Sequence, residues 1–166
     1  MWEVLSIIIF YFFALLQNSF FVYLDFFGAV PNFIFIIFFL FVFFSNKKSY
    51  FKTIFYAITA GIFLDILSIN KIGVSVALLI IIGLLIKKMQ SLLKDQKDAH
   101  PFAYFVILFC VSYIFYYLLL QIYFYFILKY ILISFNFKFL FEILYSLIFA
   151  IVGYSIYKNF IIKKND

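Results

Sequence analysis

Charged residues are scarce in this sequence, and several chemically useful residue types are nearly missing. Only 12% of the 166 residues are charged and 69% are hydrophobic, whereas about a quarter of an average soluble domain is charged. A soluble chain of this length could not hide so much apolar surface, so most side chains are expected to face lipid or each other. The composition therefore predicts one integral membrane domain over residues 1–166.

The same shortages argue against catalysis. The chain has one histidine and one cysteine, and it contains neither a glycine-rich phosphate loop nor a His/Glu pair at metal-binding spacing. We therefore expect no catalytic residue, no metal and no cofactor. The net charge of +6 comes from lysines in short loops rather than on one helical face, so nucleic acid is not an expected partner.

Long apolar runs between lysine, proline or polar clusters organise the chain. A helix needs about 20 residues, with about 17 to 25 usual, to cross the hydrocarbon layer. Six runs are candidates for such helices: residues 4–24, 29–44, 53–67, 72–86, 102–128 and 139–157. The predicted fold is an all-α, polytopic bundle of about six transmembrane helices. The third and fourth runs are short enough for a re-entrant hairpin, but its tip would bury Lys71, so two full crossings are favoured.

The loop lysines predict the orientation of the bundle. Ten lie in alternate connections or the tail, with Lys87 counted among the loop residues: Lys47, Lys48, Lys52, Lys87, Lys88, Lys94, Lys97, Lys158, Lys163 and Lys164. The remaining connections hold only Lys71, Lys129 and Lys138. Because basic loops stay on the cytoplasmic side, both termini are expected in the cytoplasm.

With this topology, the uncommon polar side chains of the apolar runs all lie toward the outer leaflet. They are Gln17, Asn18, Asn32, Asp65, Gln121 and Glu142. An ionisable group deep in a bilayer costs about 2.5 kcal/mol or more and usually faces a cavity, a bundle interior or a partner. The cluster therefore predicts an outward polar cleft or docking surface. For Asp65 a structural role fits equally well, by pairing with Lys71 or bonding backbone amides of the following turn.

A set of spaced motifs runs through the middle of the chain. It reads Pro31-Asn32-Phe33, then Lys47-Lys48, then Gly61-Ile62-Phe63-Leu64-Asp65-Ile66-Leu67, then Lys71-Ile72-Gly73. This stretch resembles the bacterial rod-shape-determining membrane protein family MreD, in which a proline opens a span, a basic loop follows, and a Gly-x-x-x-Asp-Leu-type segment leads to a short glycine turn.

The resemblance implies a non-enzymatic subunit of the cell-wall elongation machinery in the bacterial cytoplasmic (inner) membrane. Its implied partners are the single-span shape protein MreC and, through it, MreB and peptidoglycan synthases. Asp65, Gln17, Asn18, Asn32 and Gln121 would then form the partner-docking cluster. Pro31, Gly61 and Gly73 would serve helix packing and turns, since small residues permit close helix approach.

A small-molecule binder is the competing class. The substrate-binding membrane component of a vitamin-type transporter is also a six-helix bundle of this size, and an outward polar cavity would suit it. Such components resemble one another in an Ala-x-x-x-Ala pattern on the first helix, where this chain offers only Ala14. Whether an outward cavity binds a small molecule stays open at this point.

Overall fold

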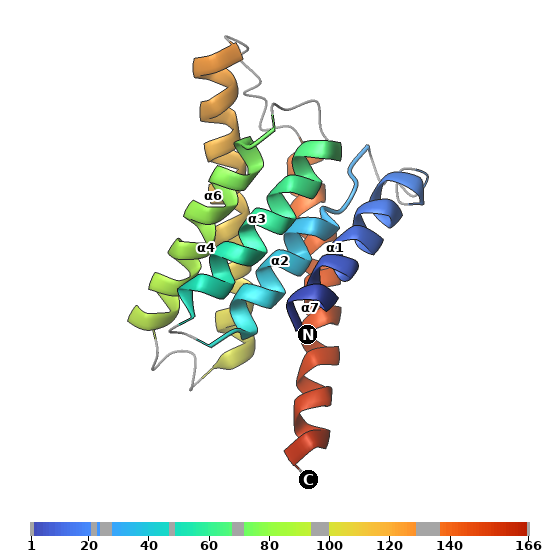
Figure 1. Ribbon diagram of the computed structural model, residues 1–166, viewed down its shortest axis with the longest axis vertical. Helices are drawn as coiled ribbons and strands as arrows, with labels where there is room; N and C mark the ends of the chain where they lie inside the picture. Colours follow the sequence, from blue (N-terminus) through green and yellow to red (C-terminus); the bar gives the residue numbers. More distant parts are fainter. Residues whose placement is uncertain are drawn as a thin grey trace.

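The structure, a computed structural model, is all-helical in the part of the chain that it describes. It describes residues 2–20, 23, 28–46, 49–67, 72–93, 100–128 and 137–165. Their helices are α1 (Trp2–Ser19), α2 (Phe33–Phe44), α3 (Tyr50–Leu67), α4 (Val74–Leu92), α6 (Pro101–Leu128) and α7 (Phe137–Asn165). Successive helices run in opposite directions, so both chain ends lie toward the lower side of the bundle in Figure 1. The all-α prediction is confirmed.

Four helices are long and apolar enough to cross a membrane. They contain the segments Tyr50–Leu67, Val74–Leu92, Pro101–Phe126 and Lys138–Asn159, while the apolar segments Val4–Ser19 in α1 and Phe33–Phe44 in α2 are shorter. The outward faces are apolar as well. On α7 a stripe at four-residue spacing is at least half exposed along its length, made of Leu140, Leu144, Ile148, Val152 and Ile156. Such a stripe on the outside of a bundle is suited to lipid rather than water.

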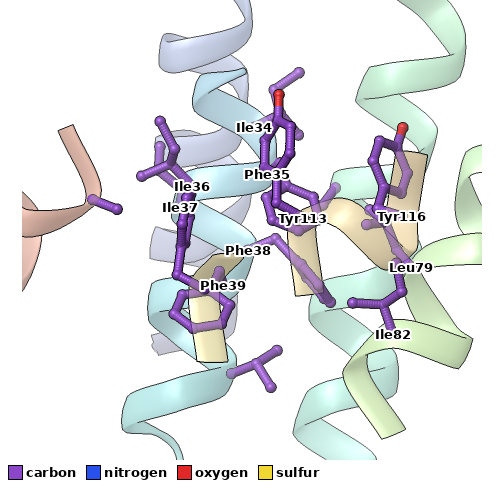
Figure 2. Close-up of a cluster of buried hydrophobic side chains, with 14 of the residues drawn as sticks. Ile34, Phe35, Ile36, Ile37, Phe38, Phe39, Leu79, Ile82, Tyr113 and Tyr116 are labelled. Carbon is purple, nitrogen blue, oxygen red and sulfur yellow. The ribbon is translucent and has the colours of Figure 1, made fainter. Parts of the chain in front are cut away.

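The short helix α2 lies in the middle of the bundle. Its sequence is hydrophobic all round, and nine of its twelve residues are buried. Figure 2 shows its side chains meeting those of α4 and α6. Aromatic rings join α2 to α6: Phe35 lies 4.9 Å from Tyr113, and Phe39 lies 5.1 Å from Phe109, between ring centroids. Twelve residues span only about 18 Å, less than the roughly 30 Å hydrocarbon layer, so the neighbouring helices must surround its ends.

Helices α3 and α4 form a close antiparallel hairpin. Gly61 on α3 permits the contact, because a Cβ at this position would lie 2.4 Å from the Cα of Val76 on α4. Nearer the other end, a Cβ on Gly83 would lie 2.7 Å from the Cγ2 of Thr53. The two glycines let the backbones approach at both levels of the hairpin.

Each predicted run corresponds to one helix, but the ends differ. Helix α2 begins at Phe33 rather than at residue 29, because Asn32 caps its first turn. Helix α4 continues to Leu92, six residues beyond the predicted end of the fourth run. Lysine and glutamine have good helix propensity, so Lys87-Lys88 extends the helix instead of ending it. The placement of Lys87 in a loop was therefore wrong.

Candidate functional site

Polar side chains from three helices meet at the N-terminus of α2. The Oδ1 of Asn32 accepts a hydrogen bond from the Phe35 amide at 3.0 Å, and the Oε1 of Gln17 on α1 accepts one from the Ile34 amide at 3.4 Å. The Asn32 amide itself donates to the Oγ of Ser146 on α7 at 3.2 Å. The first amides of a helix have no intrahelical partner, so these bonds satisfy groups that lipid could not.

Asp65 accepts hydrogen bonds from backbone amides at the N-terminus of α4. Its side chain is 2% exposed, and its two carboxylate oxygens accept hydrogen bonds from the amides of Gly73 at 2.6 Å and Ser75 at 2.9 Å. An anion at this position also interacts favourably with the positive end of the helix dipole. Gly73 has a φ of 102°, in the left-handed region that glycine adopts without strain. Asp65 and Gly61, four residues apart, thus both fit α3 against the start of α4.

A third polar contact joins α6 to α7. The hydroxyl of Tyr113, 1% exposed, donates to the Oε1 of Glu142 at 2.6 Å. One turn further along α7 lies Ser146, which binds the start of α2. We call the whole set the outer polar layer; its members are Gln17, Asn32, Asp65, Tyr113, Glu142 and Ser146.

The opposite end of α2 is held by a buried lysine. Lys87 of α4 is fully buried, and its Nζ donates to the carbonyl oxygens of Val42 at 2.8 Å, Ser45 at 3.0 Å and Asn46 at 3.2 Å. The Nζ also donates to the Oγ of Ser45 at 2.8 Å. One turn along, the Nε2 of Gln90 donates to the Phe43 carbonyl at 2.9 Å. We call Lys87 and Gln90 the inner clamp.

The chemistry of both regions is hydrogen bonding, mostly to helix ends and, for Tyr113 and Glu142, between two side chains. Among the described residues, no group of three or more His, Cys, Asp or Glu side chains lies close enough to hold a metal ion. In the outer polar layer, each of these oxygens faces a backbone amide or a phenol rather than a nucleophile and base pair. The layer is therefore built to bind helices together.

Comparison with family models supplies the assignment that the geometry cannot. Residues 1–164 match the model of the rod shape-determining protein MreD. The chain belongs to the MreD family. The predicted resemblance is thus confirmed over almost the whole chain, and this is a multi-pass membrane protein of a shape-determining family. No curated protein and no solved structure matches the chain.

Three of the residues that suggested the MreD family, Pro31, Gly61 and Gly73, lie at helix ends and close contacts, while Lys47, Lys48 and Lys71 lie outside the described residues. Pro31 is buried and its carbonyl accepts the Phe33 amide at 3.1 Å, just before the Asn32 cap. Gly61 permits the approach of α4, and Gly73 turns the chain into α4. In this member of the MreD family, the motif thus describes how α2 begins and how α3 joins α4.

Two of the predicted docking residues are not hydrogen-bonded to the outer polar layer. Asn18, near the end of α1, has an exposed side chain. Gln121 lies on α6, and its Oε1 is buried without a hydrogen-bond partner among the described residues. Gln17, Asn32 and Asp65 are instead bonded to backbone amides within the fold. The predicted cluster therefore divides into a bonded part and two residues with remaining hydrogen-bonding capacity.

The inner clamp was missed by the sequence reasoning. Lys87 stands beside Lys88 in a basic stretch, which is typical of a loop, yet the two side chains differ completely because Lys88 is exposed. The available signal was the spacing of buried positions on α4, where Lys87 follows Leu79 and Gly83 at steps of four, and Gln90 follows Ile82 and Ile86 at steps of four. Extending that apolar face by one turn would have placed both residues toward the bundle.

Proposed function

We propose that this protein is a non-enzymatic membrane subunit of the bacterial machinery for cell shape and peptidoglycan elongation. In this role it docks the single-span shape protein MreC in the cytoplasmic membrane and is linked through MreC to MreB and wall synthases. The family match over residues 1–164 carries the proposal. The outer polar layer supports it, because its residues hold helix ends in place rather than forming an arrangement of reactive groups.

The docking surface in this proposal is the outer polar end of the bundle. Asn18 and Gln121 would contact the partner, since Asn18 is exposed and the Gln121 Oε1 lacks a partner among the described residues. Gln17, Asn32 and Asp65 would support the surface by fixing the ends of α2 and α4. A transmembrane partner with matching donors would satisfy polar groups that lipid cannot solvate.

The end of α6 adds apolar area to this surface. It extends beyond the rest of the bundle at the upper side of Figure 1. Next to Gln121, half or more of each of Ile122, Tyr125 and Phe126 is exposed. Aromatic rings with one polar residue among them are typical of the centres of protein interfaces.

Affinity purification from gently solubilised native membranes, followed by mass spectrometry, tests the function. We expect recovery of a single-span periplasmic shape protein together with wall synthases. Recovery of paired ATPases with a coupling membrane subunit would instead make the protein a transporter's binding component, and would overturn the proposal.

A pair of variants tests the docking surface separately. Gln121→Leu should lower partner recovery at an unchanged level of membrane protein, because it removes the Oε1 that has no partner among the described residues. Ile107→Leu is the matched control, since Ile107 is 63% exposed on the same helix and lies toward the opposite end. Equal recovery with both variants would refute the role of Gln121 and leave the family function standing.

We also propose six full crossings with both termini in the cytoplasm. The alternating helix directions support this topology, as do the exposed Lys52, Lys88 and Lys158 at the end of the bundle where both termini lie. The test is maleimide labelling of intact cells in a Cys110→Ser background. Ile72→Cys, at a position 84% exposed, should label from outside. Labelling only after permeabilisation would instead indicate a re-entrant hairpin.

A further inference from the structure

A groove of about 560 Å³ opens on the side of the bundle, lined by α1, α2, α3 and α7. Its floor is the face of α2 that carries Ile37, Leu40 and Phe41. Gly153 of α7 forms part of one wall and has no side chain to fill the groove. A Cβ at this position would lie 2.6 Å from the Cδ1 of Leu40. The groove thus leaves part of α2, the central helix, accessible from the side of the bundle.

The groove is polar at one end. Apolar side chains line its length, and the polar groups Ser45, Asn46 and Lys52 gather where α2 ends and α3 begins. Lys52 is exposed and makes no hydrogen bond or ion pair with any residue that the structure describes. Ser45 and Asn46 already provide carbonyl oxygens to Lys87, so among the described residues the cationic group at the mouth is Lys52. An apolar channel ending at a cation matches an amphiphile with a negative head.

The size of the groove fits a small ligand. Small-ligand sites have volumes of about 300 to 1,000 Å³, a range that includes this groove.

We propose that this groove binds one anionic phospholipid from the leaflet at the lysine-rich end of the bundle. An acyl chain lies along Ile37, Leu40 and Phe41, and the phosphate contacts Lys52. Lipid in this position covers the face of α2 that α1 and α7 leave open. The proposal is independent of partner docking, which concerns the opposite end of the bundle.

Native mass spectrometry of the full-length protein tests the headgroup contact. The protein is reconstituted in bilayers of equal phosphatidylglycerol and phosphatidylcholine and released in mild detergent. We expect one phosphatidylglycerol to be retained in preference to phosphatidylcholine. Lys52→Gln should reduce this preference about fivefold, the value of one lysine at an anionic membrane surface. Lys88→Gln removes the same charge from an exposed position outside the groove and should leave the preference unchanged.

A second pair of variants tests the groove itself. Leu5→Trp fills space at its wall and should reduce retention of both lipids, whereas Ile8→Trp, on the exposed face of the same helix outside the groove, should not. Equal losses in the two lysine variants would show general surface attraction and overturn the proposal. Unchanged retention in Leu5→Trp would do the same. A retained second protein copy that Leu5→Trp releases would identify the groove as an interface between copies.

Discussion

The two ends of α2 are held by different chemistry. At its N-terminus, neutral oxygens of Asn32 and Gln17 accept amide hydrogens, and Ser146 binds the amide before the helix. At its C-terminus, the Lys87 ammonium donates to three backbone carbonyls, and Gln90 serves a fourth. The direction of the helix dipole explains the choice of a cation at this end.

The comparison shows how a helix too short to cross a membrane is kept inside a bundle. Lysine suits the C-terminal end because one ammonium has three donors, which can reach several carbonyls at once. The N-terminal end needs separate acceptors for separate amides, so its caps come from three different helices. The loss of stability on substitution should therefore depend mainly on one residue at the inner clamp. At the outer polar layer it should be shared among several residues.

Of the substitutions that distinguish the two ends of α2, Lys87→Met should cause the largest loss of stability. It leaves the carbonyls of Val42, Ser45 and Asn46 without their charged donor, and we expect a loss of about 3 kcal/mol in stability. The measurement is unfolding in mixed micelles with increasing SDS. Lys88→Met is the control, because Lys88 is exposed one residue away and should change stability by less than about 0.5 kcal/mol. Similar losses in both variants would contradict the clamp.

Asp65→Leu extends the comparison to the N-terminus of α4. One charged side chain serves two amides there, so its loss should cost about 2 kcal/mol in the same assay. Asp65→Asn keeps one acceptor oxygen and should lose about half as much. If the two variants were equally stable, the second carboxylate bond would contribute nothing.

Gln90→Leu should have a smaller effect on the inner clamp. It removes the neutral hydrogen bond to the Phe43 carbonyl and the Oε1 that accepts from the Lys87 Nζ at 3.4 Å, with an expected loss of about 1.5 kcal/mol. Combined with Lys87→Met, the total loss should fall short of the sum, since both residues hold the same helix end. Strict additivity in a double-mutant cycle would indicate two independent contacts.

Asn32→Ala should have the smallest effect of the series. The side-chain cap of Phe35 is lost, at about 1 kcal/mol, while Gln17 still accepts from Ile34. Thermal unfolding in detergent would measure the difference from Lys87→Met directly. A loss as large as that of Lys87→Met would mean that the N-terminal caps act as one unit.

The helical regions and the family were predictable because they depend on patterns along the chain. Runs of apolar residues between polar clusters locate the six helices of the described residues, and the spaced motif from Pro31 to Gly73 indicates the MreD family, which the match over residues 1–164 confirms. The depth of the polar residues could be estimated in the same way. For Asp65, the predicted bonding to amides of the following turn is confirmed, while the alternative of pairing with Lys71 lies outside the described residues.

The partners of individual side chains could not be predicted, because they depend on how each helix is rotated and where its neighbour ends. Lys87 and Lys88 are adjacent in sequence, yet only Lys87 faces the end of α2. Likewise, sequence depth groups Gln121 with Gln17, although only Gln17 reaches an amide of α2. Whether Lys87 and Gln17 find hydrogen-bond partners depends on where α2 begins and ends, and tertiary packing sets these positions.

The bond between Asn32 and Ser146 joins residues 114 positions apart in the chain. At a synthesis rate of about 5 to 20 residues per second, the ribosome needs on the order of 10 s to travel between them. During this interval α2 has entered the membrane machinery but its first turn still lacks the hydroxyl from α7. The central helix is thus among the first elements synthesised and among the last to complete its hydrogen bonds. Insertion factors that protect early segments should therefore matter most for α2.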